Sequence, residues 1–359
     1  MFRIHDRYLL KQFIRILAFS LLAFAVIYVT VDLFEMLDKF IDNKAHTRHI
    51  LLYYLFSIPY ILMYITPVSL LLASIFSLGV LGRRNELTAL ISSGISLVRI
   101  SLPIILAALT ISTGMILFNE TVVTRANRAR LDILNYDIEG KKRENPDYKE
   151  NLHYLGEGGY IYLARRYDNK SKLLFDVVLQ KFDQNTLVRR IDAKLASWND
   201  STWVFSSGFD RRFTDDNESV SAFRTLIVDG LKETPADFAK EQIEEENMNF
   251  KELLTYIQKV KRSGGEVDQF LVDLYFKFSF PFAGAIFVLL GISFTSGKRR
   301  QSIATGFGLT LIISFLYYGI LRTGRTLGQN GIIPPLLASQ MGNIIFFCIG
   351  IILLRRANR

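Results

Sequence analysis

The sequence contains a single cysteine, Cys348, which lies inside an apolar run. One cysteine cannot form a disulfide within the chain, so a disulfide-stapled fold is excluded. Histidine is also scarce, and no group of cysteines and histidines has the spacing of a metal site. The four histidines fit ordinary surface positions better than metal ligands: His5, His46, His49 and His153. We therefore expect no metal and no cofactor.

A nucleotide-binding motif is missing as well. The segments "GRRNE" and "GKRRQ" place glycine beside basic residues, but neither has the GxxxxGK[ST] spacing that cradles phosphate. No nucleophile, base and acid stand together in a catalytic pattern. We therefore expect that the chain is not an enzyme, and that any energy source belongs to another chain.

Acidic residues are fewer than basic ones, 34 against 43, which gives a net charge of +9. Such an excess can indicate nucleic acid, but here the basic residues flank long apolar runs, which is typical of membrane topology. Half of the 359 residues are hydrophobic. This content predicts membrane spans combined with a water-exposed part, and no nucleic-acid partner. No small-residue cleavage site follows the first apolar run, so we interpret it as a retained span.

Six stretches are long and apolar enough to cross a bilayer, which takes about 20 residues. The second contains Pro59 and Pro67, so we expect a kink or tilt there. The six are centred on Ile16–Val31, extending to about Leu37, and on Ile50–Gly82, Ile100–Asn119, Phe270–Ser296, Ser302–Leu321 and Ile332–Leu354.

Four basic segments fall on one side of the membrane if all six stretches span it. They are the N-terminal Arg3, Arg7, Lys11 and Arg15, the pair Arg83 and Arg84 with Arg99 beyond it, the run Lys298–Arg300, and the C-terminal "RRANR". Because basic loops stay in the cytoplasm, both termini are predicted to be cytoplasmic. Residues from about 120 to 268 then lie outside.

The external segment has a different pattern. Short runs that alternate polar and apolar residues, such as "GGYIYLARRY" and "TWVFSSGFDRRF", are separated by turn clusters such as "WNDST". This pattern predicts an antiparallel β domain, a sandwich or jellyroll. An amphipathic helix follows in "MNFKELLTYIQKVKRSGG" and ends near Gly264. The predicted divisions are 1–119 with three spans, 120–245 with the β domain, and 246–359 with the lead-in helix and three more spans.

The stretch from Gly79 to Ile100, between the second and third spans, predicts a short amphipathic helix at about 83–94. Asn85 can cap its start, and Glu86 falls in the first turn, where the helix dipole favours an anion. Gly94 is a suitable end. The apolar stripe consists of Leu87, Leu90 and Ile91. By these residues alone the helix either rests on lipid or docks onto a cytoplasmic protein.

Several segments, taken in order, resemble the LptF/LptG family of lipopolysaccharide-export permeases. "NELTALISSGIS" follows a "P-x-x-L-L-L-A" second span, and the resemblance covers nearly the whole chain. The other segments that carry it are "RYLLKQF", "LFNETVVTRANRAR", "IDAKLASWNDSTWVF", "MNFKELLTYIQKVKRSGGEVDQFLVDLYFKFSFPF" and "NGIIPPLLASQMGN".

The resemblance implies six transmembrane helices with a periplasmic β-jellyroll between the third and the fourth. It implies an inner-membrane subunit that pairs with a second subunit of the family and binds a dimeric ATP-binding protein. Such a complex extracts lipopolysaccharide and passes it to a periplasmic bridge of similar jellyrolls, with a single-span accessory subunit. F-like and G-like subunits are not distinguished, and self-pairing stays open.

The resemblance also implies roles for particular residues. The short helix is the coupling helix, and its glutamate, Glu86, engages the ATPase together with Arg84, Asn85, Leu87 and Leu90. Basic residues at the outer membrane edge contact the lipid head group, for which the candidates are Lys39, Lys44, Arg48, Arg322 and Arg325. Spans one and five form a lateral gate. Three acids in span one depart from a basic rim and leave the charge of the cargo open: Asp32, Glu35 and Asp38.

Inward positions of the β domain are candidates for an acyl-chain groove, and the alternative is that they simply fill the β core. They are Tyr160, Tyr162, Phe175, Val177, Leu179, Trp203, Phe205 and Phe223. In span four, Asp273 and Lys277 are four residues apart and are expected to neutralise each other. Two other functions stay open: an ABC permease for another lipid or lipoprotein, and a membrane-anchored sensor or scaffold.

Overall fold

The structure is a computed structural model that describes residues 4–141, 147–183, 186–199, 201–214, 217–239, 247–262, 266–295 and 303–357. It divides into a helical unit, Met1–Gly140 with Leu271–Arg359, and a β unit, Lys141–Phe270. Arg3, the basic run Lys298–Arg300, Arg359 and the predicted helix end at Gly264 lie outside the described residues.

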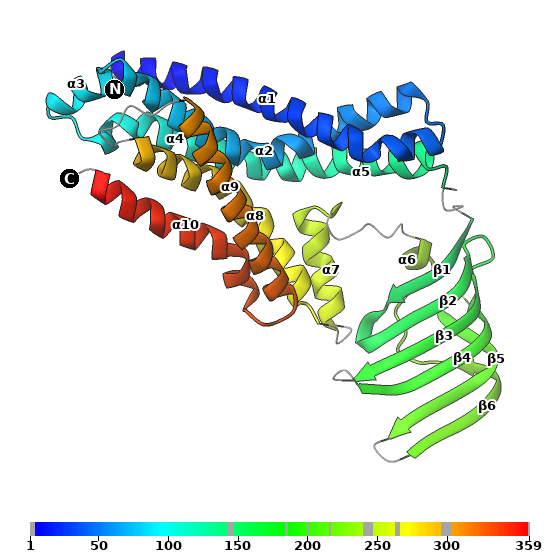
Figure 1. Cartoon of the computed structure of the whole chain (residues 1–359). Helices are drawn as coiled ribbons and strands as arrows, with labels where there is room; N and C mark the ends of the chain where they lie inside the picture. The colour runs from blue at the N-terminus through cyan, green and yellow to red at the C-terminus, as the bar shows by residue number, and fades with distance from the viewer. Residues whose placement is uncertain are drawn as a thin grey trace. The chain divides into compact units, whose positions relative to one another are not determined.

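Six helices of the described chain are long and apolar enough to cross a membrane, which confirms the predicted number of spans. They are α1 (Ile4–Asp42), α2 (Thr47–Arg83), the helix that begins as α4 (Leu97–Phe118), α8 (Asp268–Thr295), α9 (Ile303–Gln329) and α10 (Pro335–Ala357). The ends of α1 and α10 that carry the termini lie at the same end of the helical unit as the short helix α3 (Glu86–Ser92) (Figure 1).

The third span is much longer than the sequence pattern suggested. After α4 the chain continues through a π-helical turn, η1 (Asn119–Val123), then α5 (Thr124–Asp132) and a second π-helical turn, η2 (Ile133–Ile138). Residues 120–138, which we expected in the β domain, therefore belong to the helical unit. The apolar run stops near residue 119, but the polar residues that follow are compatible with a helix. Between residue 119 and Gly140 there is neither proline nor glycine, and Gly140 itself has a φ of +63°.

Glycines allow α8 to approach α2 closely. A Cβ atom on Gly291 would lie 1.9 Å from Ser74 Oγ, and one on Gly284 would lie 2.5 Å from Leu70 Cδ1. In membranes, where lipid is as apolar as leucine, such small-residue contacts are a main source of helix association. With its further contacts to α1, α4, α5 and α9, and with 78% of its most apolar window buried, α2 lies in the centre of the helical unit.

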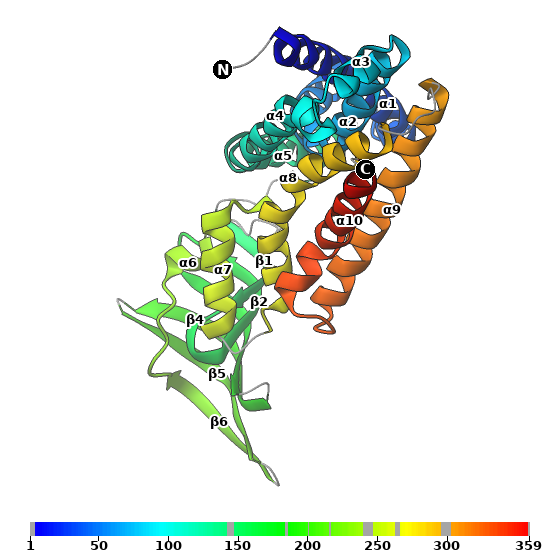
Figure 2. The same ribbon diagram turned by 90° about the vertical axis from the view of Figure 1, so that its left-hand side faces the viewer.

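A buried polar cluster joins α8, α9 and α10, of which α9 and α10 run side by side in both views (Figures 1 and 2). The Tyr317 hydroxyl donates to Asn343 Oδ1 at 2.7 Å, and Asn343 Nδ2 donates to the Ser279 carbonyl at 2.8 Å. Ser279 Oγ donates to the Ser339 carbonyl at 2.6 Å. Because a bilayer core offers no water, these bonds satisfy groups that would otherwise be costly to bury.

The β unit is a six-stranded antiparallel sheet in which each strand pairs with the next along the chain, in agreement with the predicted jellyroll-like domain. Figure 1 shows that the sheet is strongly curved. The strands are β1 (Tyr148–Leu155), β2 (Tyr160–Asp168), β3 (Leu173–Asp183), β4 (Thr186–Asn199), β5 (Thr202–Thr214) and β6 (Asn217–Ile227). A 3-10 turn, η3 (Glu157–Gly159), joins the first two.

The segment after β6 packs against the core of the sheet. Phe238, in the short helix α6 (Pro235–Ala239), contacts the rings of Tyr162 and Trp203. The buried Glu233 accepts a hydrogen bond from the Tyr162 hydroxyl at 2.7 Å, and its backbone carbonyl accepts one from Trp203 Nε1 at 2.8 Å. Burial, and then the nearby charge of Glu233, raise the pKa of Tyr162 well above its usual range.

The predicted amphipathic helix is α7 (Phe250–Arg262). Its start is a capping box, in which Asn249 Oδ1 accepts from the Glu252 N–H at 3.0 Å and Glu252 Oε2 accepts from the Asn249 N–H at 2.8 Å. Leu253 and Ile257 are buried on one face of α7, whereas Leu254 is 36% exposed.

Candidate functional site

The candidate site is α3, the seven-residue helix between α2 and α4. A helix this short is not stable by itself in water, so its position depends on anchors in the rest of the protein. Leu87 supplies one anchor, since only 5% of it is exposed and it belongs to the same core as Leu9 and Ile100. Leu90 is half-buried against this core, whereas Ile91 is 44% exposed.

The end of α3 is the glycine stop that the sequence predicts. Gly94 has a φ of +86°, and its N–H donates to the Ile91 carbonyl at 2.9 Å. The next N–H, of Ile95, donates to the Leu90 carbonyl at 3.2 Å, and the two side chains pack against the same core. This pair of bonds is a Schellman motif, which terminates the helix and satisfies its last carbonyls.

The start of α3 differs from the prediction. Asn85 does precede the helix, but its side chain forms no capping hydrogen bond, so the expected cap is wrong. Asn85 instead has a φ of 62°, a left-handed conformation that asparagine tolerates better than most residues, and its N–H donates to the Gly82 carbonyl at 3.1 Å. It forms the turn between α2 and α3.

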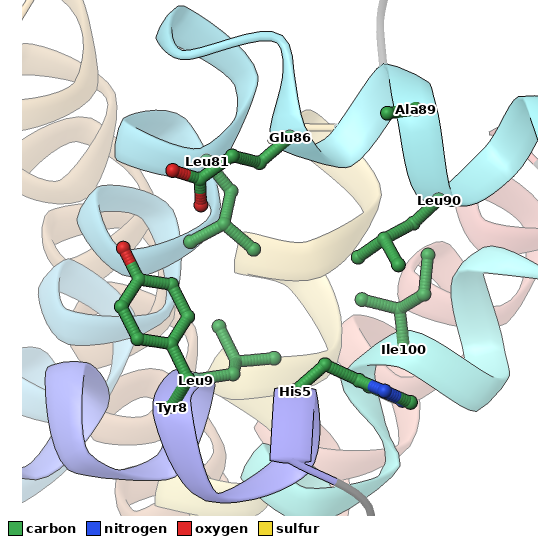
Figure 3. Close-up of a pocket in the computed structure, with 8 residues that line it drawn as sticks. All are labelled: His5, Tyr8, Leu9, Leu81, Glu86, Ala89, Leu90 and Ile100. Carbon is green, nitrogen blue, oxygen red and sulfur yellow. The ribbon is translucent and has the colours of Figure 1, made fainter.

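A cavity of about 370 Å³ separates α3 from the first turns of α1 (Figure 3). Glu86, Ala89 and Leu90 line it from α3, and His5, Tyr8 and Leu9 line it from α1, with Leu81 and Ile100 completing the wall. The Glu86 carboxylate stands near the Tyr8 hydroxyl at one side of the cavity, as Figure 3 shows.

Charged groups surround the exposed start of α3. The Glu86 side chain is 38% exposed, and Arg84 Nη1 lies 3.9 Å from its Oε1. The same guanidinium donates to the Tyr8 hydroxyl at 3.1 Å. The structure thus brings Arg84, Asn85 and Glu86 together on an accessible surface, while Leu87 packs inside the protein and supports the helix.

Sequence reasoning missed a partly buried ion pair beside α3. Arg99, in the first turn of α4, donates two hydrogen bonds of 3.1 Å to Asp6 in the first turn of α1. The Asp6 side chain is 2% exposed, and His5 Nε2 lies 3.1 Å from its Oδ1. The available signal was that Asp6 is an acid within a strongly basic N-terminal segment.

The predicted head-group residues fall into two groups. Lys44, Arg48 and Arg322 are exposed, and Lys44 forms a turn between α1 and α2 with a φ of 49°. Lys39 pairs with Glu139 at 3.2 Å, and Arg325 pairs with Asp273 at 2.8 Å. The last two cations are therefore held by acids from other parts of the helical unit, Glu139 just after η2 and Asp273 in α8.

Acids and bases inside the spans find partners on neighbouring helices. Gln329 of α9 donates to Asp273 at 3.3 Å, in addition to Arg325, and Lys277 lies 3.7 Å from Glu120.

On α1, Glu35 and Asp38 are exposed and Asp32 is half-buried. Among residues that the sequence did not single out, Arg130 of α5 lies over the ring of Tyr60 at 5.1 Å.

The candidate groove residues of the β unit lie mostly in its packed core. Buried in one cluster are Tyr160, Tyr162, Val177, Leu179, Trp203 and Phe205, and Phe223 packs partly buried against it. Phe175 lies outside this cluster, with the Arg166 guanidinium over its ring at 4.4 Å. The strand alternation is interrupted at Asp176, whose φ is +49°, so Leu174 and Val177 are both buried while Phe175 is only half-buried.

An ion-pair group lies where the start of β4 is next to the end of β5. Arg189 donates to both oxygens of Asp210, at 2.8 and 2.9 Å, and Arg212 Nη2 lies 3.6 Å from Asp210. Burial alone raises the pKa of Asp210, but the hydrogen bonds and charge of Arg189 outweigh it and hold that pKa below its usual value. Within the described residues, no group of three potential ligands could hold a metal ion.

The similarity to known proteins extends over nearly the whole chain. The sequence model of the family "Lipopolysaccharide export system permease LptF/LptG" matches residues 7–356. The chain is 19% identical over 360 residues to the lipopolysaccharide export system permease protein LptG of Escherichia coli, covering 99% of both chains. It is 21% identical over 293 residues to LptG of Haemophilus influenzae, covering 78% of both. The chain belongs to the LptF/LptG family of lipopolysaccharide export permeases.

Proposed function

We propose that this chain is a membrane subunit of an ABC-type transporter that extracts lipopolysaccharide from the inner membrane. The observation that carries the proposal is the family match over residues 7–356, together with six apolar helices and a β unit inserted after the third. The sequence contains no phosphate-cradling motif, so ATP is bound and hydrolysed by a partner chain.

The short helix α3 and both termini are cytoplasmic in this proposal. Support comes from the basic residues near this end of the helical unit, Arg7, Arg83 and Arg355, since basic residues are retained in the cytoplasm. The β unit is then periplasmic, because it is inserted after three spans.

Coupling to the ATPase takes place at α3. The helix is short, anchored on one face by Leu87 and accessible on the other through Arg84, Asn85 and Glu86. A partly exposed carboxylate in the first turn of an anchored helix is suited to receive a cationic or amide group from a partner. Movement of that partner then displaces α3 as a body.

The cargo and the second subunit meet the weakly buried spans. In α1 only 11% of the most apolar window is buried, and in α9 only 28%. These faces require lipid or a second subunit, which supports a lateral gate formed by α1 and α9. Lys44, Arg48 and Arg322 are the exposed cations that remain suited to phosphate groups of the cargo.

Transfer to the periplasmic bridge uses the edges of the sheet. In the described part of the sheet, β1 and β6 pair on one side only, and most residues of β6 are exposed. An unpaired edge accepts a strand from another jellyroll, so stacked sheets would continue one another.

The test is ATP-driven lipid release by the complex reconstituted in proteoliposomes. Glu86→Ala should reduce release while the protein still folds, and Thr88→Ala, which changes a neighbouring exposed residue, serves as the matched control. Unchanged release by Glu86→Ala would refute the coupling role. If no ATP-binding protein co-purifies with the unmodified chain, the scaffold function is favoured.

Mass spectrometry of the lipid retained after gentle purification identifies the cargo. Lipopolysaccharide is the expected species. A different lipid or a lipoprotein would keep the ATPase mechanism and change the substrate, and the acids Glu35 and Asp38 on the exposed face of α1 make this distinction informative.

A further inference from the structure

The first two turns of α1 contact the segments on both sides of α3. Before α3, Arg84 donates to the Tyr8 hydroxyl at 3.1 Å. After α3, Arg99 forms its two-bond ion pair with Asp6. The residues of each pair are far apart in sequence, yet both pairs end on residues of α1 that are only two positions apart.

The Asp6–Arg99 pair is built to hold a fixed geometry. Two parallel N–H···O bonds between a planar guanidinium and a carboxylate define both distance and orientation. Asp6 is buried and Arg99 is 37% exposed, so the pair is only partly shielded from water. The Arg99 backbone is also fixed, because its N–H donates to the Ser96 side chain at 3.3 Å.

A poorly filled region lies next to the pair, lined by His5 and Ile100, the sequence neighbours of Asp6 and Arg99. Leu87 and Leu9 share one core, but the cavity of about 370 Å³ beside them leaves the apolar packing between α3 and α1 incomplete (Figure 3). A displacement of α3 could be absorbed by this space. The polar ties at Tyr8 and Asp6 bypass it and connect α1 with both flanks of α3.

We propose that Asp6 and Arg99 are positioning residues that transmit the displacement of α3 to α1. The inference rests on the proposed coupling role of α3, and it adds the residues through which a displacement of α3 reaches α1. In its most apolar window α1 is only 11% buried, so this part of the helix has few neighbours to displace, while Leu9 and Phe13 near its start pack in the same core as Leu87. The ion pair makes α3, the start of α4 and the start of α1 one rigid group.

Lipid release and ATP hydrolysis should separate when the pair is broken. In the assembled complex, Asp6→Asn and Arg99→Lys should each lower release per ATP hydrolysed by at least about fivefold, the lower end of ordinary coupling between sites. The KM for ATP and the amount of bound ATP-binding subunit should stay unchanged. The double variant Asp6→Arg/Arg99→Asp should recover part of the release. Asp176→Asn, which breaks an exposed ion pair with Arg165 in the β unit, is the control and should release lipid normally.

A distance measurement tests the mechanical part of the inference. The chain has one cysteine, so Cys348→Ser provides a background for spin labels at Lys11→Cys on α1 and Thr88→Cys on α3, both exposed positions. When the Asp6–Arg99 pair is intact, the distance between the two spin labels should be the same with and without nucleotide. In Asp6→Asn it should change with nucleotide, because α3 then moves without α1.

The outcomes separate two kinds of failure. If the unmodified complex shows no ATP-driven release, the proposed function fails. If the unmodified complex releases lipid and an assembled Asp6→Asn complex does so equally well per ATP, the transmission role of this pair is overturned. The transmission role is also overturned if the distance between the labels changes with nucleotide in the protein that keeps Asp6 and Arg99.

Discussion

The Schellman motif at the end of α3 provides a sharp test of how this helix is held. Gly94 has a φ of +86°, and a Cβ atom added there would meet no atom within 4 Å. The cost of Gly94→Ala is therefore conformational and not steric. Placing an L-residue in the left-handed region costs about 1–2 kcal/mol.

This cost should appear as fraying of the last turn of α3. A change of about 1–2 kcal/mol multiplies the open population by about 5–30. The amides of Gly94 and Ile95, which donate to the last carbonyls of α3, should exchange hydrogen faster by the same factor, since exchange follows local opening. Hydrogen–deuterium exchange read by mass spectrometry on peptides covering residues 85–97 measures this.

Gly82→Ala is the matched control for the same substitution. Gly82 lies in the last turn of α2, its added Cβ would also meet nothing within 4 Å, and its φ is not positive. Alanine should leave this turn as stable or stabilise it by up to about 1 kcal/mol. Equal exchange rates in Gly94→Ala and in the unmodified protein would refute the reasoning, as would a similar acceleration in Gly82→Ala.

Three further predictions concern the β unit and the outer cations. Tyr162→Phe removes a hydrogen bond to the buried Glu233 carboxylate and should lower the stability of the sheet by about 1.5–3 kcal/mol, measured by fluorescence of the two tryptophans, which both lie there. The pKa of Asp210 is lower in the folded protein, so its contribution should be complete well above the unfolded-state pKa of about 4 and should be lost as the pH falls through the lower folded-state pKa; thermal unfolding should show the advantage over Asp210→Asn shrinking progressively below pH 4, and an advantage that stays constant as the pH falls would contradict the assignment. Arg325→Ala should destabilise the helical unit by about 3 kcal/mol because it leaves an acid poorly paired, whereas Arg322→Ala should keep the thermal midpoint and reduce lipid release. Equal midpoints for these two variants would show that the Arg325 pair contributes little.

Features that depend on local pattern were predictable. The length of the apolar runs predicts six spans, and alternation with turn clusters predicts the antiparallel sheet. The glycine stop of α3 was predictable because a positive φ at a helix end favours that residue. Such features follow from residues that are neighbours in sequence.

Local pattern was insufficient where two structures suit the same residues. Polarity after residue 119 marked the end of the apolar run, but polar residues form helices as readily as they form loops, and the helix continues to Ile138. Asn85 suits both a capping position and a left-handed turn, and the path from α2 into α3 selected the turn. A single residue with positive φ, Asp176, changed the face on which Phe175 lies.

The sequence by itself determined the spans, the inserted sheet and the place of the short helix, because each follows from apolar length or from a period of two or 3.6 residues. Tertiary structure decided which charges are held and which are accessible. Asp6 and Arg99 are 93 residues apart, and Asp273 and Arg325 are 52 apart. No periodicity relates such pairs. Only the packing of α1 beside α4 and of α8 beside α9 brings them within hydrogen-bond distance.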